Sequence, residues 1–116
     1  MGPFKDGWTK ADVERVIAAD DPADLAYAPV VVSMDPPDAV WAADVCRRLS
    51  THTDEWVRGA AILGFGHLAR TTGELDDAVV IPIVKAALSD ASPVVRGKAE
   101  DAVSDLQHFL GWRFPA

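Results

Sequence analysis

Apolar residues in the last third of the chain recur at steps of three and four positions, the spacing of one face of an α-helix. Ser92 and Pro93 suit a helix N-cap and its first turn, and Gly111 suits a helix end. The sequence therefore predicts a long helix between Pro93 and Gly111. Its apolar stripe consists of Val95, Ala99, Ala102, Val103, Leu106 and Leu110.

Three earlier segments have the same helical pattern. They run from Asp38 to Leu49, from Asp54 to Arg70 and from Asp76 to Leu88. Pro82 falls in the last of them, where we expect it to be tolerated only within the first turns, because proline has no N–H to donate.

The N-terminal third is less regular. Thr9 is predicted to cap a helix over residues 10–19, with Asp12 completing a capping box. Residues 23–34 include Pro29 and three consecutive valines, so helix and strand both remain open there. We favour a helix, because a lone strand would have no partner.

Two of these segments contain the same short sequence, Val-Arg-Gly-x-Ala. Its arginines, Arg58 and Arg96, are 38 positions apart. A period near 40 residues is typical of solenoids built from helix pairs. We therefore predict one domain, residues 1–116, of three antiparallel helix pairs at about 9–35, 37–71 and 76–110. The aromatic tail, residues 111–116, is expected to cover the open end of the last pair.

The repeated sequence resembles the HEAT repeat family. In that family an aspartate six residues before an arginine forms a ladder of hydrogen bonds between neighbouring repeats. Asp90 and Arg96 have this spacing. Before Arg58 the same position holds His52, and Asp54 could substitute for it. The resemblance implies an all-α fold, a short α-solenoid of about three HEAT-like pairs, in which Asp90, Arg58 and Arg96 have structural roles.

Composition narrows the possible functions. Hydrophobic residues make up 49% of the 116 residues, which is enough for one core. The formal net charge of −7 disfavours binding to nucleic acid or to anionic membranes, and favours a basic partner. The single cysteine, Cys46, allows no internal disulfide, and no secretory signal is visible. We expect a cytoplasmic protein.

Two patterns could indicate an enzyme. Gly64 to Ala69 fits the dinucleotide-binding pattern G-x-G-x-x-A, which functions only where a strand turns into a helix. Here it falls inside a predicted helix, so we interpret the glycines as sites of close helix packing. The histidines, His52, His67 and His108, have no metal-site spacing. We expect neither a metal nor a cofactor, and no enzymatic activity.

Acidic residues on the last helix could also serve as acid–base pairs. Asp101 and Asp105 lie one turn apart, opposite the apolar stripe. A solvated helix face is the simplest interpretation, and binding to a basic partner is the alternative.

The two equivalent helices differ on one outward face. At the offset of 38, Asp101 corresponds to Leu63 and Asp105 to His67, with Trp56 on the same side as Leu63. An exposed tryptophan near carboxylates has the makeup of a binding hot spot, although Trp56 could instead pack in the core. The other tryptophans, Trp8, Trp41 and Trp112, are expected in the core or at its ends. The predicted partner-binding residues are Glu55, Trp56, Leu63, His67, Asp101, Asp105 and His108.

The chain is similar to small free-standing HEAT-repeat proteins that serve as bacterial immunity factors against secreted toxins. This resemblance implies a monomer that binds a basic toxin domain and occludes its active site, with Trp56 as the anchor. An adaptor or assembly subunit of a cellular complex is the alternative. A DNA glycosylase of HEAT-like fold is disfavoured, because it would need a basic groove.

Overall fold

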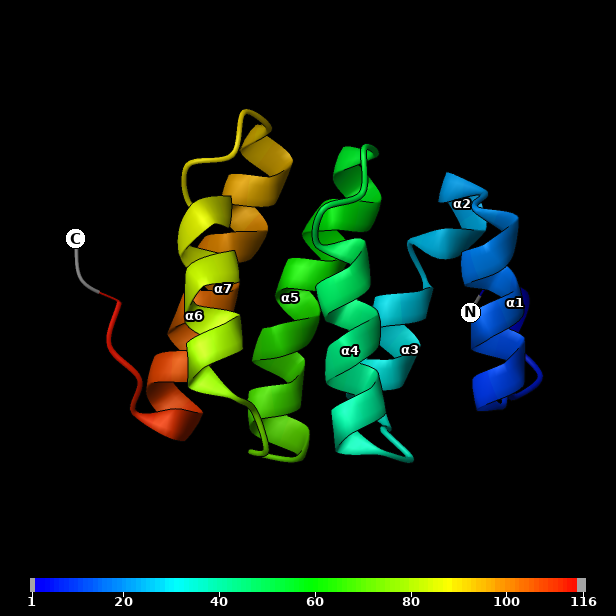
Figure 1. Ribbon diagram of the computed structural model, residues 1–116, viewed down its shortest axis with the longest axis horizontal. Coiled ribbons are helices and arrows are strands. Elements are labelled where there is room, and N and C mark those ends of the chain that lie inside the picture. The colour runs from blue at the N-terminus through cyan, green and yellow to red at the C-terminus, as the bar shows by residue number, and fades with distance from the viewer. Residues whose placement is uncertain (1, 115–116) are drawn as a thin grey trace.

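The computed structural model describes residues 2–114, and all of the regular secondary structure in that range is helical (Figure 1). The helices are η1 (Gly2–Phe4), α1 (Lys10–Ala19), α2 (Pro22–Leu25), α3 (Ala28–Met34), α4 (Ala39–Leu49), α5 (Glu55–Thr71), α6 (Asp77–Ala87) and α7 (Pro93–Leu110). The predicted all-α class is confirmed. None of the helices in residues 2–114 is both long and apolar enough to cross a membrane.

Helix α1 begins and ends where the sequence predicts. The Thr9 side chain accepts a hydrogen bond from the Asp12 backbone N–H at 3.2 Å, and the Asp12 carboxylate accepts one from the Thr9 N–H at 2.8 Å. This reciprocal pair is the predicted capping box. Asp20 ends the helix in the left-handed conformation, with φ 54°.

The segment from Ala23 to Met34, where a strand was possible, is helical but broken. Helix α2 ends at Leu25, and α3 starts at Ala28. Pro22 and Pro29 each lie in the first turn of a helix, where the missing N–H has no intrahelical partner to lose. The prolines thus start helices here instead of interrupting one.

The four later helices begin after side chains that accept hydrogen bonds from the first turn, as predicted for Ser92. These caps are Asp38, Asp54, Asp76 and Ser92. Pro82 is the sixth residue of α6 and lies in its second turn. The helix continues through Pro82, which lies on the exposed side, while Val80, Val84 and Ala87 are buried.

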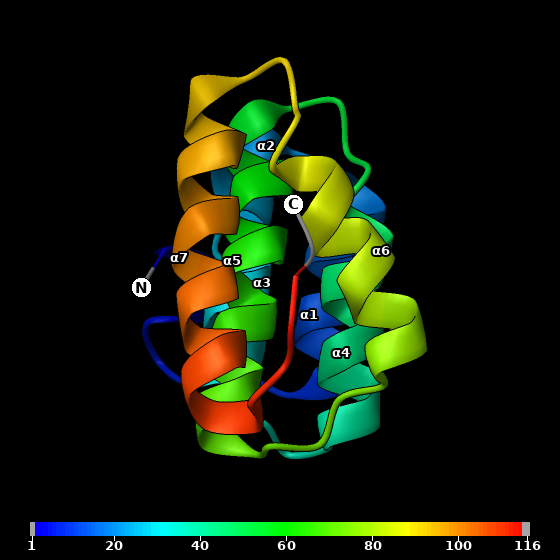
Figure 2. The same cartoon turned by 90° about the vertical axis from the view of Figure 1, so that its left-hand side faces the viewer.

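The helices form two layers. Figure 2 shows α1, α4 and α6 in one layer and α3, α5 and α7 in the other. The chain reverses direction as it passes between layers (Figure 1). Helix α5 lies at the centre, in contact with α3, α4 and α7. The largest fully buried side chains include Phe65, Ile62 and Leu68 from α5, Leu25 from α2 and Leu106 from α7.

Aromatic residues cover both ends of this core. Trp8 stacks on Trp41 with ring centroids 6.2 Å apart, and the Trp41 indole N–H donates to Glu14 at 3.1 Å. At the other end Trp112 and Phe114 are partly buried against the core, where the tail crosses between α6 and α7 (Figure 2). The last two residues of the predicted tail, Pro115 and Ala116, lie outside the described residues.

Candidate partner-binding surface

Glycines allow α5 and α7 to approach closely. A Cβ atom at Gly66 would lie 2.9 Å from the Asp105 carboxylate and 3.1 Å from the Ala102 Cα. Near the start of both helices, a Cβ atom at Gly59 would lie 3.2 Å from the Lys98 side chain. The earlier glycine of α5 lies against the earlier residue of α7, and the later glycine against the later residue. Helices α5 and α7 therefore run in the same direction.

The remaining glycine of α5, Gly64, faces the other layer of helices. A Cβ atom at Gly64 would lie 2.6 Å from the Cys46 sulfur on α4. Burial raises the pKa of the Cys46 thiol to about 12, so it is protonated and unreactive at neutral pH. The interpretation of the glycine pattern as helix packing is confirmed, because all of Gly64 to Ala69 lies inside α5.

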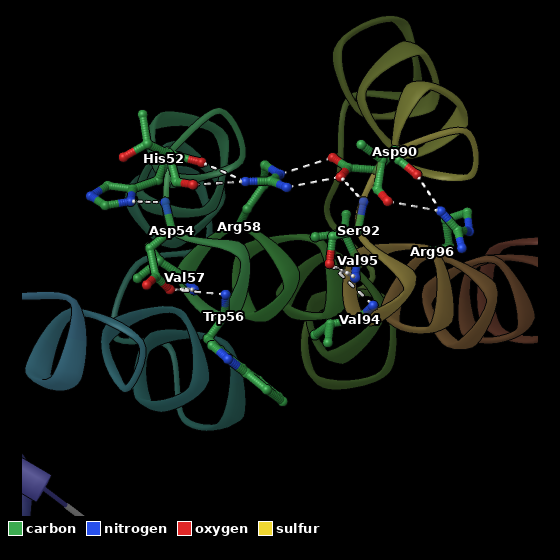
Figure 3. A network of polar contacts seen from close by, with 12 residues as sticks. His52, Asp54, Trp56, Val57, Arg58, Asp90, Ser92, Val94, Val95 and Arg96 are labelled. Atoms are coloured by element: carbon green, nitrogen blue, oxygen red, sulfur yellow. Dashed lines mark hydrogen bonds and ion pairs between the residues drawn. The ribbon is translucent and has the colours of Figure 1, made fainter.

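A line of polar contacts links the turns that precede α5 and α7 (Figure 3). The Arg58 guanidinium donates to both carboxylate oxygens of Asp90, each at 2.8 Å. The same guanidinium donates to the backbone carbonyls of His52 and Thr53, at 3.0 and 3.2 Å. Two parallel hydrogen bonds between charged groups are among the stronger polar contacts in proteins.

Arg96 makes the same kind of contact with backbone carbonyls, in the turn before α7. It donates to the backbone carbonyls of Asp90 and Ala91, at 2.7 and 3.2 Å. The three residues predicted to be structural, Asp90, Arg58 and Arg96, therefore meet in one network.

His52 takes part in the network at the position where Asp90 stands in the next turn. Its Nδ1 accepts the Asp54 N–H at 3.0 Å, just as the Asp90 carboxylate accepts the Ser92 N–H at 2.9 Å. The hydrogen bond to Nδ1 places the ring hydrogen on Nε2, 2.7 Å from the Asp20 carboxylate, to which it is donated. The alternative that Asp54 takes the role of the repeat aspartate is wrong. The Asp54 carboxylate caps α5 instead.

Electrostatics keep the central pair of this network charged. Hydrogen bonds from the Arg58 guanidinium and then from the Ser92 backbone lower the pKa of Asp90. The hydrogen bond to Asp90 in turn raises the pKa of Arg58. The ion pair is therefore fully formed at neutral pH.

The predicted partner-binding residues lie on the outer side of the α5–α7 pair. On α5, Trp56 is 60% exposed, while Leu63 and His67 are half-buried. Core packing of Trp56 is thus excluded, and its indole points away from the polar network (Figure 3). Glu55 is exposed beside it. On α7, Asp105 is half-buried, whereas Asp101 and His108 are exposed.

His67 contacts residues that the sequence reasoning did not include. Its Nδ1 lies 2.8 Å from the Met34 sulfur and 3.4 Å from the Arg70 guanidinium. Burial and then the charge of Arg70 lower the pKa of His67, against a smaller opposing effect of Asp105. His67 is therefore neutral at neutral pH.

A sequence signal existed for two of the missed residues. Arg70 and Lys98 occupy the same helical stripes as His67 and Asp101, one turn away from each. Met34 had no such signal, because it comes from the segment whose secondary structure was open. Within residues 2–114 no cluster of three or more His, Cys, Asp or Glu side chains is arranged to hold a metal ion.

Comparison with known proteins gives one informative result. No family model matches the chain, and no curated protein matches its sequence. The structure is similar to one chain of the crystal structure of a CDI complex from Cupriavidus taiwanensis LMG 19424. The TM-score is 0.77 at 24% sequence identity, over 94% of this chain and 95% of that one. At this identity the likeness shows a shared fold over 94% of this chain.

Proposed function

We propose that this chain is an immunity protein of a contact-dependent inhibition (CDI) system, which binds a cognate bacterial toxin and neutralises it. The observation that carries the proposal is the end-to-end structural likeness to a chain of a CDI complex. The net charge of −7 and the exposed Trp56 favour the binding member of such a pair. The protein acts by binding and catalyses no reaction.

The architecture in this proposal is a short solenoid of HEAT-like helix pairs. Its support is the recurring contact of Arg58 and Arg96, each with the carbonyls of its own preceding turn. The ion pair between Arg58 and Asp90 then joins one turn to the next. Stacked pairs of this kind leave a continuous surface on their second helices, which is where such proteins bind partners.

The proposed mechanism is occlusion of the active site of the toxin by the outer side of α5 and α7. Trp56 supplies the apolar anchor, because a buried interface tryptophan typically contributes about 2–4 kcal/mol. Asp101 and Asp105 face basic groups of the toxin. Charges at an interface rim mainly raise the association rate, and a monomer with this charge would be drawn to a basic domain. Glu55, Leu63, His67 and His108 complete the contact surface.

Growth rescue tests the proposal. The toxin domain encoded by the neighbouring gene is expressed in a sensitive bacterium, with and without this chain. We expect the wild-type protein to restore growth, and the double variant Asp101→Lys, Asp105→Lys to fail. The exposed pair Asp6→Lys, Asp77→Lys is the matched control, since it makes the same change in net charge elsewhere.

Two results would count against this function. One is a wild-type chain that gives no protection at a confirmed expression level. The other is full protection by the α7 double variant. Because Asp105 lies against Gly66, the single variant Asp101→Lys, at an exposed position, guards against a loss of folding.

A further inference from the structure

A shallow hollow of about 280 Å³ lies where α2 meets the first turn of α5. Apart from Trp56, its residues are absent from the predicted binding surface. The hollow therefore extends the surface around Trp56 towards the N-terminal helices. Its lining consists of Pro22, Ala23, Ala26, Tyr27, Asp54 and Trp56.

Two aromatic rings give this hollow its chemical character. Trp56 is 60% exposed and Tyr27 is 39% exposed, so both present ring surface to a ligand. The Tyr27 ring packs on the Gly2 backbone, where a Cβ atom would lie 2.5 Å from it. The backbone N–H of Trp56 donates to the Asp54 side chain at 2.9 Å, which fixes the start of α5 beside the hollow. Between the rings the lining is small and apolar.

The surroundings of the hollow are acidic. Asp54 lines it and Glu55 adjoins Trp56, while Asp21 caps α2 on its other side and Asp24 lies within that helix. The carboxylates of Asp54 and Glu55, at the start of α5, also offset the partial positive charge of that helix end. From Val16 to Cys46 the sequence contains no lysine, arginine or histidine, whereas its acidic residues are Asp20, Asp21, Asp24, Asp35, Asp38 and Asp44.

We propose that this hollow binds a lysine or arginine side chain of the protein partner. The aliphatic part of such a side chain packs on the alanines, and its cationic group lies over the Trp56 and Tyr27 rings. Aromatic faces attract cations, tryptophan most strongly, and nearby carboxylates add to the attraction. This proposal rests on the proposed function for the existence of the partner, but the chemistry of the hollow can be tested alone.

The test uses small basic probes and the isotope-labelled protein. N-acetyl-lysine methylamide and N-acetyl-arginine methylamide are titrated while the Trp56 indole N–H and the Ala23 and Ala26 amide signals are followed by NMR. We expect saturable shifts at these signals with at least one of the two basic probes. The norleucine analogue, which has a similar stem and no charge, is expected to bind at least tenfold more weakly.

Variants locate the binding within the protein. Trp56→Ala removes an exposed ring, leaves the core intact and is expected to abolish the shifts at Ala23 and Ala26. Asp24→Asn combined with Glu55→Gln is expected to weaken binding several-fold and to reduce its dependence on salt. Val40→Ala, a change at an 81% exposed apolar residue on α4, is the matched control and is expected to bind the basic probe normally.

Equal binding of the norleucine analogue would overturn the proposal in favour of a merely apolar site. An absence of saturable shifts with both basic probes, or shifts that persist in Trp56→Ala, would overturn it as well. None of these results bears on growth rescue, so failure here leaves the immunity function standing. Conversely, a chain that binds lysine in this hollow and rescues no cell would separate the two proposals.

Discussion

Helices α5 and α7 contain the same short sequence, and the arginine of each donates to carbonyls of its own preceding turn, yet the two helices have different surroundings. Helix α5 contacts α3, α4 and α7, whereas α7 contacts α5 and α6. Residues on several sides of α5 are therefore buried, among them three glycines. In α7 the buried residues fall on one stripe: Val95, Ala99, Ala102 and Leu106. The repeated sequence determines the turn and the start of each helix, and the neighbours determine which faces are buried.

The outward-facing residues of the two helices also differ. The residues of α5 are mostly apolar at its start, and their counterparts on α7 are mostly charged. Such a division suits the proposed binding surface, with an aromatic anchor on the central helix and charges at the edge. At the offset of 38 residues the pairs are Trp56 and Val94, Ala60 and Lys98, Leu63 and Asp101, His67 and Asp105, and Arg70 and His108.

The largest effect is expected from breaking the contact that the two turns share. Asp90→Ala removes both hydrogen bonds from Arg58 and the bond from the Ser92 N–H, so we expect a loss of about 2–3 kcal/mol in the free energy of unfolding. Urea unfolding followed by circular dichroism measures it. Asp6→Ala, at an exposed position, is the control. A loss no greater than that of the control would show that the two turns are stable independently.

A smaller loss is expected from filling the space between the two helices. Gly66→Ala places a methyl group 3.1 Å from the Ala102 Cα, and backbone cannot move aside as a flexible side chain can. Overpacking costs about 1–3 kcal/mol, partly offset by the roughly 1 kcal/mol that alanine gains over glycine in a helix. Thermal unfolding of this variant should therefore begin at a lower temperature than in the wild type. An unchanged or raised midpoint would contradict the close approach of α5 and α7.

The pH dependence of stability isolates the part of the Asp90 contribution that requires its charge. Because the pKa of Asp90 is lower in the folded protein than its ordinary value of 3.8, its stabilising contribution is complete above that value. It is lost as the pH falls through the lower, folded pKa. Asp90→Asn should flatten the fall in stability below about pH 4. Urea unfolding across this range tests the sign, and an Asp90→Asn curve parallel to the wild type would refute it.

The smallest effect is a gain in stability, expected at the glycine of α7 that corresponds to Gly59. Within residues 2–114, and apart from Gly97's chain neighbours and the adjacent backbone of its own helix, no heavy atom lies within 4 Å of a Cβ atom built on Gly97. Gly97→Ala should therefore stabilise the protein by about 0.5–1 kcal/mol through helix propensity alone. Gly59→Ala meets the Lys98 side chain at 3.2 Å and should gain less. Equal gains in parallel urea titrations would contradict the difference between the two helices.

Features with a local cause could be predicted from the sequence. The capping box of Thr9 and Asp12, and with it the bounds of α1, depends on residues three positions apart. The break between α2 and α3 follows from two prolines. Whether a proline starts or interrupts a helix depends on where that helix begins, and the pattern of valines does not reveal this point. The role of His52 depends on Asp20, 32 residues earlier in the chain, and was not foreseen for that reason.

The candidate site divides in the same way. Trp56, Leu63 and Asp101 could be proposed from helical spacing and the 38-residue offset, because both are properties of a single helix. Met34 and Tyr27 could not, since they reach the surface only through the packing of α2 and α3 beside α5. The positions of these side chains depend on tertiary contacts that no local pattern records.

The most direct test of the proposed function is the affinity of the chain for the toxin domain encoded by the neighbouring gene. Calorimetry with the wild type, Trp56→Ala and the exposed control Val40→Ala compares the proposed anchor with an apolar residue on the other layer. We expect Trp56→Ala to weaken binding about 30-fold, the equivalent of roughly 2 kcal/mol, and Val40→Ala to leave it unchanged. Binding of equal strength by the wild type and Trp56→Ala would contradict the proposed surface on α5 and α7.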